Sequence, residues 1–387
     1  MAVATLTLAL SLEGRGERIS TSHYQIQTDL DPDLAKTLAI QMDAMYDEYA
    51  RRFAGLAPSP GGAPFRVYLF ANRADYLRFT GPLYQNTGGL FMPRRGALAA
   101  FLEGQGREGL RRTLQHEAFH QFTHAAMGRQ LPPWLNEGLA QVFEESIWTG
   151  DGFLLYQVPP RRVRRSIADR SAGRLIPFTT FATLTDEQWS AAFTGDPSRG
   201  EAQYNQAWAM VQFLARSTDA GGRPRLPRLI ALLQLLHEGR NSAIAFKEIF
   251  PDGAELNREF SSFVAQLRPT AAAELLERQS VLADFVGELV LRGQLPRELI
   301  DAREILQTGG YRLHYSRGDL QWDSDADIGT YFADPSGRML SSIDLHFELS
   351  SREFPDIVCR WTGGIRLRTR FRSTDGRLEH DTMVEQF

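Results

Sequence analysis

The feature that most constrains the fold is the spacing of two histidines and a glutamate around a pair of prolines. His116 and His120 lie four residues apart in a segment, 107–128, that has helical periodicity. Positions four apart share one face of a helix, so both imidazoles can be directed at one point. Two prolines then favour a break before a second helix, 133–147, which carries Glu137. The sequence therefore predicts a helical hairpin that brings Glu137 back over the histidine pair.

The residue types at these positions are those of a catalytic zinc site. His116, His120 and Glu137 offer two neutral nitrogens and one carboxylate for one Zn²⁺. Together with a water they form the open site of a catalytic zinc, whereas a structural zinc has a closed site. Glu117 completes the HExxH arrangement, in which this carboxylate takes a proton from the attacking water without being a ligand. Glu117 is thus the predicted general base.

Three further residues are predicted to lie near the zinc ligands without binding the ion. Asn136 and Glu144 are expected to lie behind the ligands. Glu144 is seven residues after Glu137 and shares its helix face, so its carboxylate can orient an imidazole N–H. His124 is eight residues from His116, about 12 Å along a helix axis, so the two cannot share one ion. His124 is expected to be a structural or rim histidine.

Periodicity along the chain predicts an α+β protein. A small mixed β-sheet is expected to pack on a helical metallopeptidase body, followed by a small antiparallel β module at the C-terminus. Strand-like runs occupy 4–12, 22–28, 65–71 and 96–103, with helices at 31–53 and near 72–80. Helical segments follow at 107–128, 133–147, 201–216, 224–238, 241–249 and 254–267. The predicted parts are 1–105, a mixed α/β subdomain with a substrate-edge strand, 106–308, the helical zinc-binding subdomain, and 309–387, the C-terminal β domain.

Composition excludes several classes of partner. The net charge of −4 leaves no basic field for nucleic acid. The single cysteine, Cys359, excludes an intramolecular disulfide, and no stretch approaches the ~18 apolar residues of a transmembrane segment. Residues 5–12 alternate leucine with small residues, unlike the continuous apolar block of a signal peptide. The protein is expected to be soluble, and either cytoplasmic or, if a leader has been removed, periplasmic or secreted.

The segments HEAFH and WLNEGLAQVFEE together resemble the glutamate-zincin superfamily, which contains thermolysin and the aminopeptidase N-like enzymes. The resemblance implies the ligands His116, His120 and Glu137, and Glu144 falls on the second acidic position of the aminopeptidase branch. A wider pattern over about residues 20–268, including YNQAWAMVQFL, resembles a poorly characterised bacterial family of peptidase-like proteins. The C-terminal β region lies outside this resemblance.

The resemblance also implies roles that the spacing does not. Related enzymes stabilise the oxyanion with a Tyr or His from a later helix, which makes Tyr204 the candidate here. The strand Ala97–Leu102 is the candidate edge on which a peptide adds as an extra strand. The aminopeptidase branch carries an upstream acidic motif that binds a free amine, but this chain has no carboxylate between Gly81 and Phe101. Endopeptidase activity is therefore favoured over aminopeptidase activity.

The predicted function is that of a zinc metallopeptidase that hydrolyses peptide bonds of a peptide or protein substrate. Glu117 is the base and then the proton donor to the leaving amine. Two alternatives stay open. The first is a zinc-binding but catalytically silent protein of the same fold that serves recognition or assembly. The second is a hydrolase that uses the same zinc on a non-peptide amide.

Overall fold

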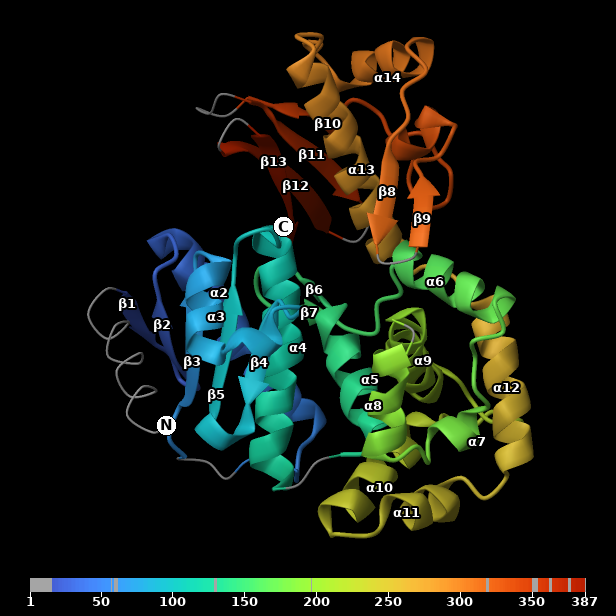
Figure 1. The fold of residues 1–387 in the computed structure, drawn as a ribbon. Coiled ribbons are helices and arrows are strands. Elements are labelled where there is room, and N and C mark those ends of the chain that lie inside the picture. The colour runs from blue at the N-terminus through green and yellow to red at the C-terminus, as the bar shows by residue number, and fades with distance from the viewer. Residues whose placement is uncertain are drawn as a thin grey trace. The chain divides into compact units, whose positions relative to one another are not determined.

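The computed structural model describes residues 16–386 apart from 57, 59–61, 129–130, 196, 318–319, 350–353, 362–363 and 375–376 (Figure 1). The strand predicted at 4–12 lies outside the described residues. Contacts within the chain define two compact units, 1–146 with 175–265, and 147–174 with 266–387. The boundaries of these units differ from those of the predicted parts 1–105, 106–308 and 309–387. The three parts stay predictions. The predicted α+β class is confirmed. None of the described helices is long and apolar enough to span a membrane.

The first unit contains a five-stranded mixed sheet. Its strands, in the order β1-β2-β3-β5-β4, are β1 (Glu17–Ser20), β2 (Tyr24–Thr28), β3 (Phe65–Phe70), β5 (Ala97–Phe101) and β4 (Gly89–Met92). The central strands β2, β3 and β5 are parallel, whereas β1 and β4 pair antiparallel at the two edges. Asp31 caps helix α2 (Pro32–Arg52) by accepting a hydrogen bond from the Leu34 amide. The predicted strands at 22–28, 65–71 and 96–103 are confirmed.

The strand order corrects one prediction. Strand β5, proposed as the substrate edge over Ala97–Leu102, pairs with β3 on one side and β4 on the other. All five of its residues are buried, as expected for an interior strand. The edge next to the histidine helix is therefore β4, whose outer side leaves backbone groups available for other partners.

Helix α4 (Gly106–Met127) carries the histidines, and α5 (Pro133–Glu144) follows it after the prolines. An aromatic cluster fixes α4 against α2 and α5. The Tyr49 hydroxyl donates to the Gln115 carbonyl at 2.7 Å, and its ring lies 4.7 Å from that of Phe143. Helix α5 ends three residues before the predicted boundary at 147. The Gln115 side-chain amide donates to the carbonyls of Phe143 and Ser146, which supports this helix end.

Helix α3 (Arg73–Thr80) packs against strands β3 and β5 of the sheet. The remaining helices of this unit build the body beside α5. They are α7 (Phe178–Phe181), α8 (Asp186–Gly195), α9 (Pro197–Arg216), α10 (Leu226–His237), α11 (Ser242–Ile249) and α12 (Gly253–Gln266). Short 3₁₀ turns lie at Pro82–Tyr84 and Pro93–Arg95. The buried ring of Phe178 contacts Trp134, Phe213 and Phe260, so residues from α5, α7, α9 and α12 share one core.

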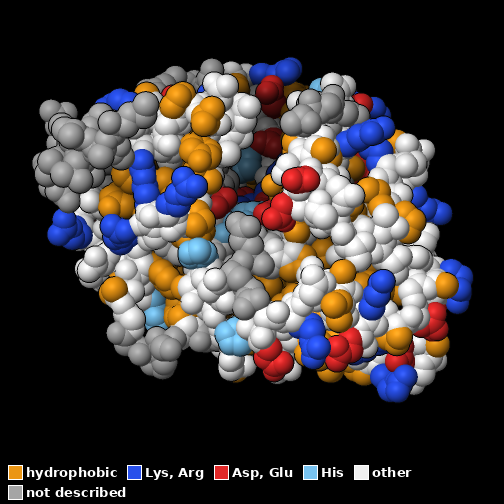
Figure 2. Space-filling model, turned by 60° about the horizontal axis from the view of Figure 1, so that its bottom comes forward, with side chains coloured by type: hydrophobic (Ala, Val, Ile, Leu, Met, Phe, Trp, Pro, Cys, Tyr) orange, Lys and Arg blue, Asp and Glu red, His pale blue; other side chains and the backbone are white. Residues whose placement is uncertain are grey.

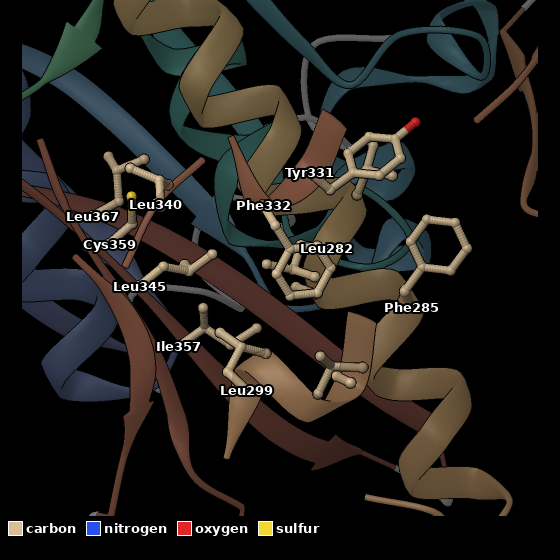
Figure 3. Packing of buried hydrophobic residues seen from close by; sticks show 14 of the residues in the cluster. Leu282, Phe285, Leu299, Tyr331, Phe332, Leu340, Leu345, Ile357, Cys359 and Leu367 are labelled. Carbon is tan, nitrogen blue, oxygen red and sulfur yellow. The ribbon is translucent and has the colours of Figure 1, made fainter. Parts of the chain in front are cut away.

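The second unit packs helices on a four-stranded antiparallel sheet of order β10-β11-β12-β13. Its elements are β6 (Ile147–Trp148), β7 (Phe153–Leu154), α6 (Pro160–Ser171), α13 (Ala271–Leu291), α14 (Leu299–Thr308), β8 (His314–Arg317), β9 (Leu320–Asp323), a 3₁₀ turn (Ile328–Phe332), β10 (Leu345–Glu348), β11 (Asp356–Trp361), β12 (Ile365–Thr374) and β13 (Arg377–Gln386). Figure 3 shows Leu282 and Phe285 of α13 with Ile357 and Cys359 of β11 in its core. The predicted C-terminal antiparallel module is confirmed.

Candidate metal centre

Three side chains from α4 and α5 converge in the first unit. The Nε2 atoms of His116 and His120 lie 3.1 Å apart. The carboxylate of Glu137 lies 3.3 Å from His116 Nε2 and 3.5 Å from His120 Nε2. The structure thus brings together the three residues predicted as ligands, in a group that could hold one metal ion.

The separations of these atoms are close to those between the ligands of one tetrahedral ion. Zinc bonds to nitrogen and oxygen are about 2.0–2.2 Å long, so two ligand atoms at tetrahedral corners lie about 3.3–3.5 Å apart. The two imidazole nitrogens, 3.1 Å apart, lie slightly closer than this, and each lies 3.3–3.5 Å from a different oxygen of the Glu137 carboxylate. The buried Oε2 atom of Glu137 also has no hydrogen-bond donor among the described residues. A cation between these atoms would satisfy lone pairs that the protein leaves facing one another.

The charges around His116 also favour a cation. Burial lowers the pKa of His116, but interactions with the carboxylates of Glu137, Glu144 and Glu117 outweigh it and raise the pKa well above its ordinary value. For Glu137, burial raises the pKa, and the two histidines lower it by a larger amount. The site therefore attracts positive charge and keeps Glu137 ionised, as a metal ligand must be.

Glu117 lies next to the ligands without joining them. Its Oε2 atom accepts a hydrogen bond of 2.8 Å from the backbone amide of Phe91 in strand β4. The edge strand thereby fixes the carboxylate through a main-chain donor. Glu117 lines the same cleft as the three predicted ligands but is not a member of the group that could hold the ion.

Glu144 reaches the far side of His116. Its Oε2 atom lies 3.1 Å from His116 Nδ1. Because an ionised carboxylate only accepts hydrogen bonds, Nδ1 is the donor and Nε2 faces the other ligands. Arg112, one helical turn before His116, donates from Nη2 to Glu144 at 2.6 Å and to Glu145 at 3.1 Å.

The ligand group opens into a cleft with about 310 Å³ of water-accessible space. In Figure 2 histidine and acidic side chains lie within a hollow of the displayed face. Tyr204 of α9 lines the cleft with the ligands, and its ring packs edge-on against Trp189 and Phe193. Burial, followed by the charges of the nearby glutamates, raises the pKa of Tyr204, so its hydroxyl stays protonated at neutral pH.

The other predicted residues have distinct positions. Asn136 lines the cleft, but within the described part of the chain its side chain makes no hydrogen bond to the ligands. His124 is exposed at the cleft, 5.4 Å from the Phe91 ring, and lies outside the ligand group as expected. Sequence reasoning missed Arg112 and Glu145. The helical spacing of Arg112 from His116 was the available signal, since it places both on one face of α4.

A protein-family model matches the part of the chain that contains these residues. A family model described as a protein of unknown function (DUF1570) matches residues 111–221, less than a third of the chain. The matched segment includes His116, Glu117 and His120 of the HExxH motif, Glu137 of the NE motif, and Tyr204. No curated protein matches the chain.

Proposed function

We propose that the chain is a zinc-dependent metallopeptidase whose single ion is held by His116, His120 and Glu137. The observation that supports this most directly is the convergence of two imidazole nitrogens and a carboxylate in an open cleft, with Glu117 beside them. A structural zinc would take four protein ligands, whereas three ligands and an open position are typical of hydrolysis. The likeness of these motifs to glutamate-zincins favours the same conclusion.

Each residue at the cleft has a separable task in this proposal. When bound, zinc supplies a Lewis acid that polarises the scissile carbonyl and acidifies water. Glu117 accepts the proton of the attacking water and passes it to the leaving amine. The hydroxyl of Tyr204 donates to the oxygen that becomes negative as the carbonyl is attacked. Glu144 keeps His116 in the orientation that directs Nε2 to the ion.

The cleft favours an internal peptide bond over a chain end. Its lining consists of Thr87, Gly89, Leu90, Phe91, Pro93, His116, Glu117, His120, Thr123, His124, Leu131, Asn136, Glu137 and Tyr204. The described lining contains no Arg or Lys to bind a terminal carboxylate. Its carboxylates are those already assigned to the base and the ligand, so neither is available for a terminal amine. We therefore propose an endopeptidase.

The Glu117→Gln variant tests the mechanism. Gln keeps the shape of Glu117 but cannot accept a proton, so hydrolysis of unfolded casein should be abolished while one zinc per chain remains by metal analysis. Glu187→Gln, at an exposed position in α8, is the matched control and should keep full activity. Hydrolysis by the Glu117 variant with its metal intact would refute the assigned role.

The wild-type protein separates the remaining alternatives. Incubation with casein, a peptide library and a panel of non-peptide amides is compared with and without a chelator. Chelator-sensitive cleavage of peptides supports the proposal. Cleavage of non-peptide amides alone indicates another hydrolase, and zinc binding with no cleavage indicates a recognition or assembly protein.

A further inference from the structure

Arg112 joins two carboxylates at the rear of the candidate metal centre. Its Nη2 atom lies 2.6 Å from Glu144 Oε1 and 3.1 Å from Glu145 Oε1. The side chain of Glu145 is only 1% exposed, and those of Arg112 and Glu144 are each 17% exposed. An ionised carboxylate as deeply buried as Glu145 needs a charged partner, because an uncompensated charge in the interior is costly.

The contacts connect Arg112 to the ligand atoms through one intermediate. Glu144 uses one oxygen for Arg112 and the other for His116 Nδ1, at 3.1 Å. Arg112 and His116 are four residues apart on α4, so the helix fixes the distance between the guanidinium and the imidazole. Glu144 is the last residue of α5, where the backbone no longer constrains it on both sides. The guanidinium therefore holds this carboxylate at the oxygen that does not face His116.

The positive charge of Arg112 also compensates negative charge behind the candidate metal centre. Glu144 and Glu145 bring two carboxylates to the end of α5, and the guanidinium of Arg112 contacts both of them. Burial lowers the pKa of Arg112, but Glu145 and Glu144 outweigh it and raise the pKa, so the guanidinium stays charged. This charge offsets the repulsion between the carboxylates of Glu144 and Glu145 at the end of α5.

We infer that Arg112 is a positioning residue, which holds Glu144 against His116 Nδ1 and thereby sets the affinity of the site for its metal. This inference rests on the proposed metal site but not on any particular substrate. Groups that orient a ligating histidine typically contribute about 10–100-fold to metal affinity. Loss of Arg112 should therefore weaken zinc binding even where the fold is kept.

The experiment measures Zn²⁺ affinity of the full chain by competition with a chromogenic chelator, and the absorption spectrum of the Co²⁺-loaded protein. Arg112→Gln should bind Zn²⁺ about 10–100-fold more weakly and alter the Co²⁺ spectrum. Arg112→Lys keeps the charge but presents a single ammonium group, so its affinity should be intermediate. Arg111→Gln is the control. Arg111 precedes Arg112 on the same helix and lines a separate apolar pocket with α2.

A double variant separates positioning from folding. Arg112→Gln combined with Glu145→Gln removes both members of the buried ion pair, so it should recover thermal stability without recovering zinc affinity. Recovery of both, or wild-type affinity in folded Arg112→Gln, would overturn the inference. Failure of all Arg112 variants to fold would make the residue structural and also overturn it. A wild-type protein that binds no Zn²⁺ would instead refute the proposed function.

Discussion

Gly138 allows helix α5 to approach α9, and replacing it with alanine tests whether this approach positions the proposed ligand Glu137. A Cβ atom at Gly138 would lie 2.5 Å from the carbonyl oxygen of Ala207 and 2.7 Å from Val211 Cγ2. An ordinary contact begins near 3.4 Å, so the helices must separate by about 0.9 Å or distort locally. The obstruction at Ala207 is backbone, which cannot rotate away as a side chain can.

The expected cost is that of an overpacked core, about 1–3 kcal/mol. For a unit of 150–250 residues, each kcal/mol changes the Tm by about 2–4 °C, so Gly138→Ala should lower the Tm by about 2–12 °C. Glu137 precedes Gly138 on α5 and moves with it. Metal ligands tolerate displacements of only about 0.2 Å, so zinc affinity should fall together with stability.

Thermal unfolding followed by circular dichroism and chelator competition measure the two effects. Gly287→Ala in α13 is the control, because its Cβ would meet only Leu378 Cδ2, at 3.8 Å. Alanine is the better helix former, so this variant should gain about 0.5–1 kcal/mol. If Gly138→Ala also raises the Tm and keeps its zinc affinity, the close packing of α5 on α9 does not position Glu137.

Three other variants or treatments have defined outcomes. Tyr204→Phe should lower kcat about 10²–10³-fold with zinc content unchanged; an unchanged kcat excludes the phenol as oxyanion donor. Burial raises the pKa of Glu48, but Arg51 and Arg52 outweigh it, so the pKa lies below 4.5. This stabilisation is present above about pH 4.5 and lost as pH falls through the lowered pKa. Glu48→Gln should cost about 0.4–1 kcal/mol at pH 7 and little at pH 2 in urea unfolding. Burial raises the pKa of Cys359 to about 12, so a thiol reagent at pH 8 should label it only after denaturation.

The ligand group could be predicted from the sequence because helical spacing fixes it. His116 and His120 must share a face of α4, and the prolines before Glu137 leave few paths except a hairpin. The order of the strands could not be predicted in this way, because the residues of a strand do not indicate which strands pair with it. Both β4 and β5 are short and mostly apolar, and only the register that places β5 between β3 and β4 identifies the edge.

The contacts behind the ligands could be predicted only in part. The position of Glu144 near an imidazole could be predicted, because it lies seven residues after Glu137 on the same helix face. The burial of Glu145 could not, because two adjacent acidic residues at the end of a helix do not indicate which of them is buried. The donor to Glu117 is the main-chain amide of Phe91, and every residue except proline has one. A backbone contact of this kind depends on the fold, so no residue type in the sequence can indicate it.

The faces of α4 explain how one helix can serve both stability and chemistry. Residues 112, 116 and 120 follow one another at intervals of four and face α5, where the carboxylates lie. Glu117 and Gln121 form a second row that meets the sheet, through the amide of Phe91 and the carbonyl of Arg66. A third row, with Phe119 and Phe122, fills the aromatic core against α2. Because the proposed metal ligands and the proposed base occupy adjacent rows, any movement of β4 relative to α5 changes the distance between Glu117 and the ligand group. Packing of the aromatic row therefore controls the geometry of the site as well as the stability of the unit.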